Sequence, residues 1–153
     1  MSAEELVAGL VGCYNDRRLD DVASRYAAGA TVHPAGWPEA VDAANWIAAF
    51  GMMLESFPDL TIRPRHVASG RGVAVLEARL TGTNRGPFHL GAVDRLVLGT
   101  DADRLPPTGR TMDIAGTVVF ELTDDHVARE RHYWPLVDTL VQLGLVSSQP
   151  LAS

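Results

Sequence analysis

Residues 112–134 read MDIAGTVVFELTDDHVARERHYW, two long β-type runs joined by a short polar turn. The first run covers Met112 to Leu122, and the residues from Thr123 to Asp125 are of the types that favour a tight turn. The second run, Val127 to Trp134, is therefore expected to pair back on the first as the last strand, which Pro135 ends. This hairpin predicts an antiparallel sheet in the C-terminal half of the chain.

A second hairpin is expected just upstream of the first. Apolar residues recur in β-type segments between Leu60 and Leu80, and the turn Ser69-Gly70-Arg71-Gly72 divides them. The intervening stretch from Pro87 to Pro107 fits no element well, and it exceeds the roughly 12 to 15 residues usual for a structureless connection. We therefore expect 87–107 to be a lid loop or to carry a short strand around Arg95 to Leu98.

Three helices are predicted before the sheet. Ser2 followed by Glu5 is a capping-box signature, and apolar residues at helical spacing then continue the first helix to about Arg18. A second helix is predicted over 19–27, ended by Gly29, with a short strand over 30–33, and a third helix is predicted over 40–57. Leu136 to Leu145 is apolar at helical spacing and predicts a short C-terminal helix.

Helices followed by a curved antiparallel meander predict an α+β fold in which the helices cover only one face of the sheet. We expect a single domain, 1–153, shaped as a cone, because 153 residues suit one hydrophobic core. A concave sheet that is covered on one side leaves room for a cavity. The predicted ligand is one small apolar molecule.

Composition excludes several classes of partner. The net charge is −6 and the 13 basic residues are all arginines spread along the chain, so no nucleic-acid partner is expected. The N-terminus lacks a signal peptide and no stretch approaches the roughly 20 apolar residues of a membrane span, so a cytoplasmic protein with no membrane partner is expected. The lone Cys13 is interpreted as core filler. The histidines lack metal-site spacing and no phosphate-binding loop is found, so neither a metal nor another cofactor is expected.

Four stretches carry a resemblance to a known family. They are Phe57-Pro58-Asp59-Leu60, Thr81-Gly82-Thr83-Asn84-Arg85-Gly86-Pro87-Phe88, Pro107-Thr108-Gly109-Arg110, and Glu130-Arg131-His132-Tyr133-Trp134 with Gln142-Leu143-Gly144-Leu145. In this order they resemble motifs of the SnoaL-like polyketide cyclases, within the nuclear-transport-factor-2-like superfamily.

The resemblance implies a cone of three helices against a curved sheet, often dimeric through the outer sheet face, with a buried pocket and no cofactor. It also implies ring closure by acid–base chemistry, typically with an Asp and a His. The sequence departs from the family motifs twice: Asn84 stands where the family has His, and Pro135 stands where Asp usually follows the Tyr-Trp pair.

Strand alternation predicts the catalytic pair. Side chains of the last strand alternate between its two faces, so 128, 130, 132 and 134 are expected to point inward and 129, 131 and 133 outward. Glu130 and His132 would then lie roughly 7 Å apart on the cavity side. Burial there is expected to raise the pKa of the glutamate and to lower that of the histidine, and general acid–base groups are most effective when their pKa lies near neutral pH. The alternative is structural: Glu130 pairs with an arginine, and His132 is a satisfied polar group of the core.

Further residues are candidates for the cavity. His33 is a candidate second base, or a loop histidine that binds backbone. His66 shares its expected strand face with Leu60 and Ile62 and is a candidate for the cavity wall or the core. Like His66, several bulky residues are candidates to shape the cavity and bind substrate, or else to fill the core: Tyr14, Trp37, Trp46, Phe50, Met53 and Trp134. Three residues are expected to face outward: Glu77, Arg79 and Asp113. The acids of 87–107 are expected either to be solvated or to reach over the substrate, and they are Asp94, Asp101 and Asp103.

Three functions are compatible with these residues. The first is a cofactor-independent cyclase or isomerase of natural-product biosynthesis, such as that of polyketide antibiotics, acting through Glu130 and His132 while the cavity folds the substrate. Aldol, ether or pyran, and pericyclic closures stay open. The second is a non-catalytic member of the superfamily that binds a small molecule. The third, an epoxide-opening hydrolase, needs an inward Asp-Arg-Asp triad, which the expected outward parity of Arg79 and Asp113 disfavours.

Overall fold

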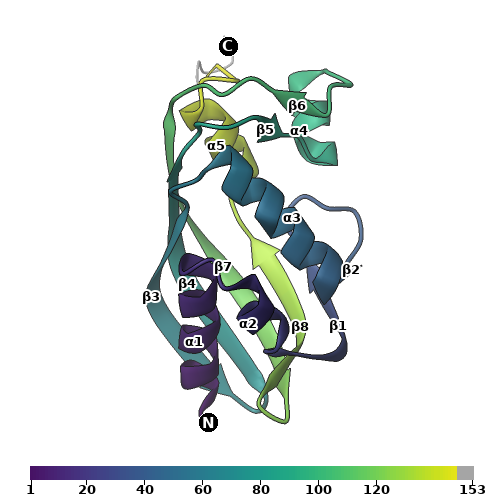
Figure 1. Cartoon of the computed structure of the whole chain (residues 1–153), viewed down its shortest axis with the longest axis vertical. Coiled ribbons are helices and arrows are strands. Elements are labelled where there is room, and N and C mark those ends of the chain that lie inside the picture. The colour runs from purple at the N-terminus through teal and green to yellow at the C-terminus, as the bar shows by residue number, and fades with distance from the viewer. Residues whose placement is uncertain (148–153) are drawn as a thin grey trace, which may run out of the picture.

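A computed structural model describes residues 1–147, in which six strands form one curved sheet (Figure 1). The sheet order is β2-β1-β8-β7-β4-β3. The strands of this sheet are β1 (Tyr26–His33), β2 (Val41–Asp42), β3 (Thr61–Gly70), β4 (Val73–Thr83), β7 (Thr111–Thr123) and β8 (His126–Tyr133). All neighbouring pairs are antiparallel except β1 and β8, which run parallel. The α+β class and the predicted meander are confirmed, and the parallel pair is an addition to them. Residues 148–153 of the expected 1–153 domain lie outside the described part.

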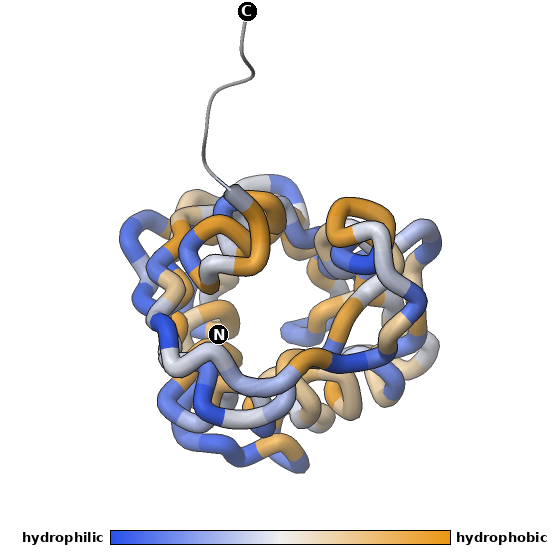
Figure 2. The backbone as a smooth tube through the Cα atoms, turned by 90° about the horizontal axis from the view of Figure 1, so that it is seen from above, coloured by the Kyte–Doolittle hydropathy of each residue, from blue (hydrophilic) through white to orange (hydrophobic). Residues whose placement is uncertain are grey.

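The helices lie on the concave side of the sheet and at one of its ends. They are α1 (Ala3–Asn15), α2 (Leu19–Ala23), α3 (Ala43–Ser56), α4 (Ala92–Leu98) and α5 (Leu136–Gln142). In Figure 1, α1 to α3 stand against the concave face, and α4 and α5 lie near the end opposite the N-terminus. Seen from above, the backbone runs as a ring around the long axis (Figure 2). This is the expected cone.

The first helix begins as predicted and ends earlier. Ser2 N donates to Glu5 Oε2 (2.7 Å) and Glu5 N donates to Ser2 Oγ (3.1 Å), which completes the capping box. The helix ends at Asn15 rather than at Arg18, because Arg17 takes a left-handed φ of 62°. Asn15 then joins helix to sheet: its amide donates to the carbonyl of Ile62 and accepts from the Ile62 N–H, both at 2.8 Å.

The second helix and the first strand differ from the prediction. The helix ends at Ala23 instead of Ala27, and β1 begins at Tyr26 instead of Ala30. Pairing with β8 holds Tyr26 opposite Val127, and this tertiary pairing overrides the local helical pattern. Gly29 does not end a helix; it sits inside β1 with φ +75°, where the register with β8 shifts between Tyr26 and Thr31. Between these pairs β1 advances by five residues while β8 advances by two, so β1 carries an enlarged bulge here.

The two predicted hairpins are present. β3 and β4 pair across the turn at Arg71 and Gly72, and β7 and β8 pair across Asp124 and Asp125, all four in left-handed conformations. In β8 a bulge modifies the predicted alternation. Leu122 pairs with Val127 and Glu121 pairs with Arg129, so Ala128 has no partner opposite it. Val127 therefore points into the core, and the prediction of an inward Ala128 is wrong at that position.

The segment 87–107 is folded. Phe88–His89 (β5) pairs with Arg104–Leu105 (β6), and α4 lies between them. The expected strand around Arg95 to Leu98 is therefore wrong, because these residues form the second half of α4, which ends at Gly99 with φ 63°. The buried Phe88 anchors the segment through an edge contact with Phe57, at a ring-centroid distance of 5.9 Å.

The bulge glycine gives a test of the fold. Gly29→Ala is expected to lower the free energy of unfolding by about 1–2 kcal/mol, the cost of a side chain in left-handed backbone. No atom of residues 1–147 lies within 4 Å of the added Cβ, so backbone strain alone is measured. Gly12→Ala, in α1 and with equally open surroundings, is the matched control and should be neutral or stabilising by up to about 1 kcal/mol. Urea unfolding measures both, and wild-type stability of Gly29→Ala would contradict the bulge.

Candidate active site

A cavity of about 530 Å³ lies between the concave face of the sheet and the helices. Its wall takes residues from α1, the loop 34–38, α3, the segment 88–95, strands β4, β7 and β8, and α5. The wall is mainly apolar, and a volume of this size falls within the range of small-molecule sites. Trp37 and Met52 belong to the wall but are 36% and 45% exposed, so the cavity opens beside them.

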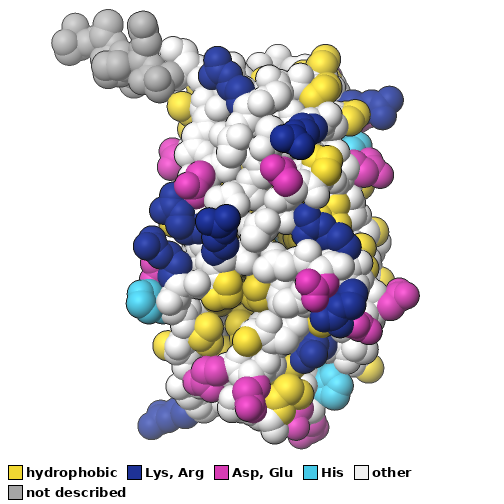
Figure 3. Space-filling view, turned by 60° about the vertical axis from the view of Figure 1, so that its left-hand side comes forward, with side chains coloured by type: hydrophobic (Ala, Val, Ile, Leu, Met, Phe, Trp, Pro, Cys, Tyr) yellow, Lys and Arg dark blue, Asp and Glu magenta, His cyan; other side chains and the backbone are white. Residues whose placement is uncertain are grey.

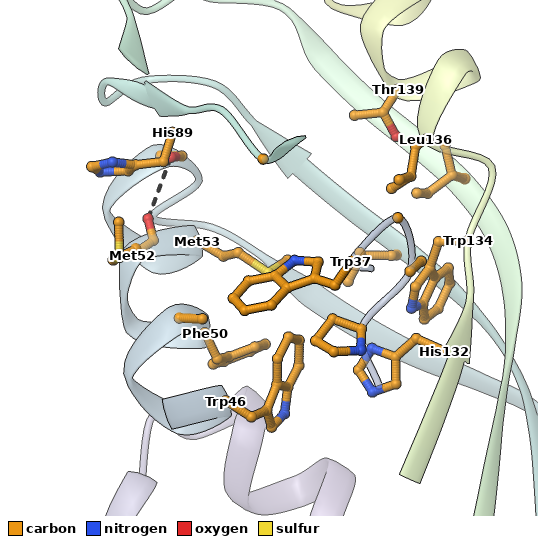
Figure 4. A pocket seen from close by; sticks show the side chains of 18 of the residues that line it. Trp37, Trp46, Phe50, Met52, Met53, His89, His132, Trp134, Leu136 and Thr139 are labelled. Carbon is orange, nitrogen blue, oxygen red and sulfur yellow. Dashed lines mark hydrogen bonds between the residues drawn. The ribbon is translucent and has the colours of Figure 1, made fainter. Parts of the chain in front are cut away.

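Most of the residues predicted for the site lie in this wall. They are Tyr14, Trp37, Trp46, Phe50, Met53, Glu130, His132 and Trp134. Figure 4 shows that the aromatic rings come from different elements and converge on the region of His132. The ring of Trp46 meets the imidazole of His132 edge-on at 4.6 Å between centroids, with an interplanar angle of 89°. Helical spacing placed Trp46 on the inner side of its helix, and strand alternation placed His132 on the inner face of its strand, so the meeting of these two side chains could be predicted from the sequence.

Two predicted histidines lie outside the cavity wall. His66 is exposed, because the register of β3 shifts between Pro64 and His66 and turns the later side chains over. Its strand partner is Glu77, not an inward residue. His33 is also exposed, and its Nε2 lies 2.9 Å from the backbone oxygen of Trp37. The predictions that His66 lies in the cavity wall and that His33 is a base reaching into the cavity are therefore wrong.

The polar end of the cavity is a continuous chain of hydrogen bonds. Trp46 Nε1 donates to the Tyr14 hydroxyl (2.8 Å), and the hydroxyls of Tyr14 and Tyr26 are 2.9 Å apart. The Tyr26 hydroxyl in turn donates to Glu130 Oε2. Because Tyr14 accepts from Trp46 and Tyr26 donates to Glu130, the Tyr14 proton points to Tyr26. Every donor in the chain is thus directed toward Glu130.

Glu130 is 4% exposed, and both of its carboxylate oxygens are occupied. Tyr26 donates to Oε2, and Oε1 lies 2.5 Å from His132 Nε2. An ionised carboxylate only accepts, so the proton between them belongs to Nε2. The second ring nitrogen, Nδ1, has no hydrogen-bond partner among residues 1–147. Glu130 therefore orients the imidazole, and Nδ1 of His132 is the atom left to meet a ligand.

The two tyrosines in the chain are held as neutral donors. Burial raises the pKa of Tyr26 well above its usual value, and the nearby Glu130 charge and Tyr14 add to this. The pKa of Tyr14 is also raised, first by burial and then by Glu130. Sequence reasoning missed Tyr26, because its residues were read as helix. Its position opposite the last strand was the missing signal.

The two departures from the family motifs have structural explanations. Asn84 is fully buried and is not in the cavity wall. Its Nδ2 donates to the carbonyls of Ser56 (3.2 Å) and Gly86 (2.9 Å), and its Oδ1 accepts from Thr108 N (2.8 Å). It therefore clamps the end of α3 to the strands that follow. Pro135 stands at the N-terminal end of α5.

A second set of ionisable side chains lies in the wall at 88–95. His89 Nε2 is 3.2 Å from Glu55, and Arg95 binds Asp103 at 3.0 Å. Asp94 Oδ2 accepts from Gly91 N (2.9 Å), and burial raises the pKa of this carboxyl. Asp94 thus lines the cavity, which agrees with the alternative that these acids reach toward a ligand, whereas Asp101 and Asp103 are exposed.

Outside the cavity, Arg79 pairs with Asp113 at 2.8 Å on the exposed face of the sheet, as their parity predicted. Neither Arg79 nor Asp113 can therefore belong to the inward Asp-Arg-Asp triad that an epoxide-opening hydrolase would need. Within residues 1–147 no three His, Cys, Asp or Glu side chains gather as a metal site would require. No helix in the same range is long and apolar enough to cross a membrane.

The cone with its helix-covered sheet and enclosed cavity defines the nuclear-transport-factor-2-like fold. A family model described as SnoaL-like polyketide cyclase matches residues 4–143. The chain belongs to this family. No curated protein matches it.

Solved structures share the fold. A candidate SnoaL-like polyketide cyclase from Jannaschia sp. CCS1 is 25% identical with a TM-score of 0.75, over 95% of this chain and 92% of that one. IdmH from Streptomyces antibioticus, a candidate polyketide cyclase, is 18% identical with a TM-score of 0.75, over 94% and 99%. AclR from Streptomyces galilaeus, a candidate hydroxylase, is 18% identical with a TM-score of 0.77, over 97% and 84%.

The buried tyrosines predict alkaline behaviour. Their native pKa lies above the unfolded value of about 10, so the stability that they contribute is complete below that pH and is lost as pH rises above it. Phenolate absorbance should show Tyr14 and Tyr26 ionising only as the protein unfolds. Tyr14→Phe and Tyr26→Phe should each leave the reversible part of the titration unchanged. A smaller reversible signal in either variant would contradict the burial of its hydroxyl.

Proposed function

We propose that the protein is a cofactor-independent cyclase of natural-product biosynthesis, closing a ring in a polyketide-like apolar substrate. The observation that carries the proposal is the buried Glu130–His132 pair at the polar end of an apolar cavity of about 530 Å³. Family membership supports the class of reaction. An imidazole with one nitrogen held by a carboxylate and the other open is suited to general acid–base catalysis.

His132 is the group proposed to exchange a proton with the substrate, through Nδ1. Glu130 holds the opposite nitrogen, and its own oxygens are both engaged, so it acts as the orienting partner. This sharpens the sequence hypothesis, in which the two side chains were equal partners. When such a pair loses its correct protonation or geometry, the rate of the catalysed reaction falls by about 10²–10⁴-fold.

The apolar wall is proposed to fold the substrate into a reactive conformer. Trp37, Trp46 and Trp134 surround the imidazole, and they restrict a flexible chain near Nδ1 (Figure 4). Holding reacting groups in place lowers the entropic part of the barrier. The proposal covers aldol, ether or pyran, and pericyclic closures, which need the same enclosure and differ in how much proton transfer they require.

Activity of variants tests the acid–base pair. A linear polyketide precursor is incubated with each variant, and the ring product is followed by liquid chromatography with mass spectrometry. His132→Ala is expected to lower kcat by about 10²–10⁴-fold, and Glu130→Gln to lower it as well, since the imidazole loses its orienting carboxylate. His33→Ala is the matched control and should retain the wild-type rate, because His33 is exposed outside the wall.

Circular dichroism establishes that each variant is folded. Full rates in folded His132→Ala and Glu130→Gln would refute the acid–base role and leave shape as the source of catalysis. Precursors that bind without conversion in the wild type would instead support a non-catalytic binding protein of the same superfamily.

The outer face of the sheet is proposed to form a homodimer. Val75 and Val119 are neighbours in register on this face, between the pairs Arg79–Asp113 and Glu121–Arg131. Charges of both signs and an apolar centre suit a two-fold interface, where one patch meets its own copy. Figure 3 shows the mixed charges on the side where β3 lies.

A charge placed in this face tests the dimer. Val75→Glu is expected to give a monomer by sedimentation velocity, because a carboxylate at the centre of a closed interface would be desolvated. Val97→Glu is the matched control: this valine is similarly exposed but lies on α4. It should sediment as the wild-type dimer does. A monomeric wild type would refute the proposal.

A further inference from the structure

The charges in the cavity wall are unevenly compensated. Each cationic or potentially cationic side chain in the described wall has a carboxylate of its own: His132 has Glu130, His89 has Glu55, and Arg95 has Asp103. Asp94 is the exception, since it has no cationic partner among residues 1–147. Asp94 is therefore the one carboxylate of the described wall that has no basic side chain as its partner.

Asp94 has an ordinary structural role that accounts for only part of its position. It caps α4 by accepting from Gly91 N through Oδ2. Its other oxygen, Oδ1, has no partner in the described chain, although the side chain is half-buried in the cavity wall. Burial raises the pKa of the carboxyl, so the charged form is held at a cost. An asparagine could accept the same hydrogen bond from Gly91 N without this cost, but it would lose the favourable interaction of a carboxylate with the N-terminal end of the helix.

The surroundings of Asp94 place it within reach of a ligand. Gly36 packs against Val93 and Leu136, so the loop 34–38, α4 and α5 converge on one side of the cavity. The exposed wall residue Trp37 belongs to the same loop, and its ring can face a cation. At the polar end of the cavity, the Glu130 carboxylate offers no free oxygen to a ligand cation, because its two oxygens are occupied by Tyr26 and His132.

We propose that the ligand of this cavity is an apolar molecule bearing a basic amine, whose ammonium group pairs with Asp94 while its apolar body extends toward His132. The proposal rests on the proposed function in that the cavity must accept a small molecule. It makes Asp94 a specificity-determining residue. Anionic ligands are disfavoured, because the described wall offers them no unpaired cation.

Three matched probes test the charge preference without knowledge of the substrate. Adamantylmethylamine, adamantylmethanol and adamantane carboxylate share one apolar body and differ in charge, and none absorbs where tryptophan does. All three tryptophans of the chain line the cavity, so quenching of intrinsic fluorescence reports binding. The amine is expected to bind about fivefold more tightly than the alcohol, and the carboxylate more weakly than both.

Two variants assign the preference. Asp94→Asn keeps an oxygen for the Gly91 N–H and removes the charge, so it should bind amine and alcohol equally. Asp101→Asn removes the same charge from an exposed position of the same segment outside this cavity, and it should keep the wild-type preference.

The outcomes separate the two proposals. If the carboxylate binds as tightly as the amine, the inference is overturned while the cavity remains a binding site. If the amine preference survives in Asp94→Asn, the assignment to Asp94 is overturned. If no probe binds at all, the cavity does not accept small apolar molecules, and the proposed function falls together with the inference.

Discussion

The buried carboxylate of Glu130 is the constraint on which the inner end of the molecule depends. A charge taken out of water costs several kcal/mol unless hydrogen bonds replace its hydration. The replacement comes from Tyr26 on β1 and His132 on β8, with Tyr14 of α1 and Trp46 of α3 behind them. One side chain thereby fixes the relative placement of two strands and two helices, and it does so at the place where the ligand would meet the protein.

Much of this arrangement follows from periodicity in the sequence. Alternation along the last strand puts Glu130 and His132 on the concave face, and helical spacing puts Trp46 and Phe50 inside. The errors fall where an extra residue enters a strand. A bulge in β3 turns His66 outward, and a bulge in β8 makes Val127 rather than Ala128 point into the core. No local sequence pattern marks either bulge.

Other features depended on pairing between distant segments. Tyr26 and Ala27 have the composition of a helix end, and only their partner in β8 makes them strand. Asp94 resembled a solvated loop acid because α4 could not be foreseen in 87–107. The roles proposed for these residues stay predictions. The fold does not decide them either, since a candidate hydroxylase and candidate cyclases share it.

The parallel pairing of β1 with β8 has a consequence for biosynthesis. The two hydrogen-bonded groups of Tyr26 and Glu130 are 104 positions apart, so the first strand has no neighbour on this side until β8 has left the ribosome. Contacts of such long range are slow to form, and an unpaired strand edge invites association with other chains. Nascent chains should therefore be most vulnerable to aggregation during the interval in which β1 is exposed and β8 has yet to emerge.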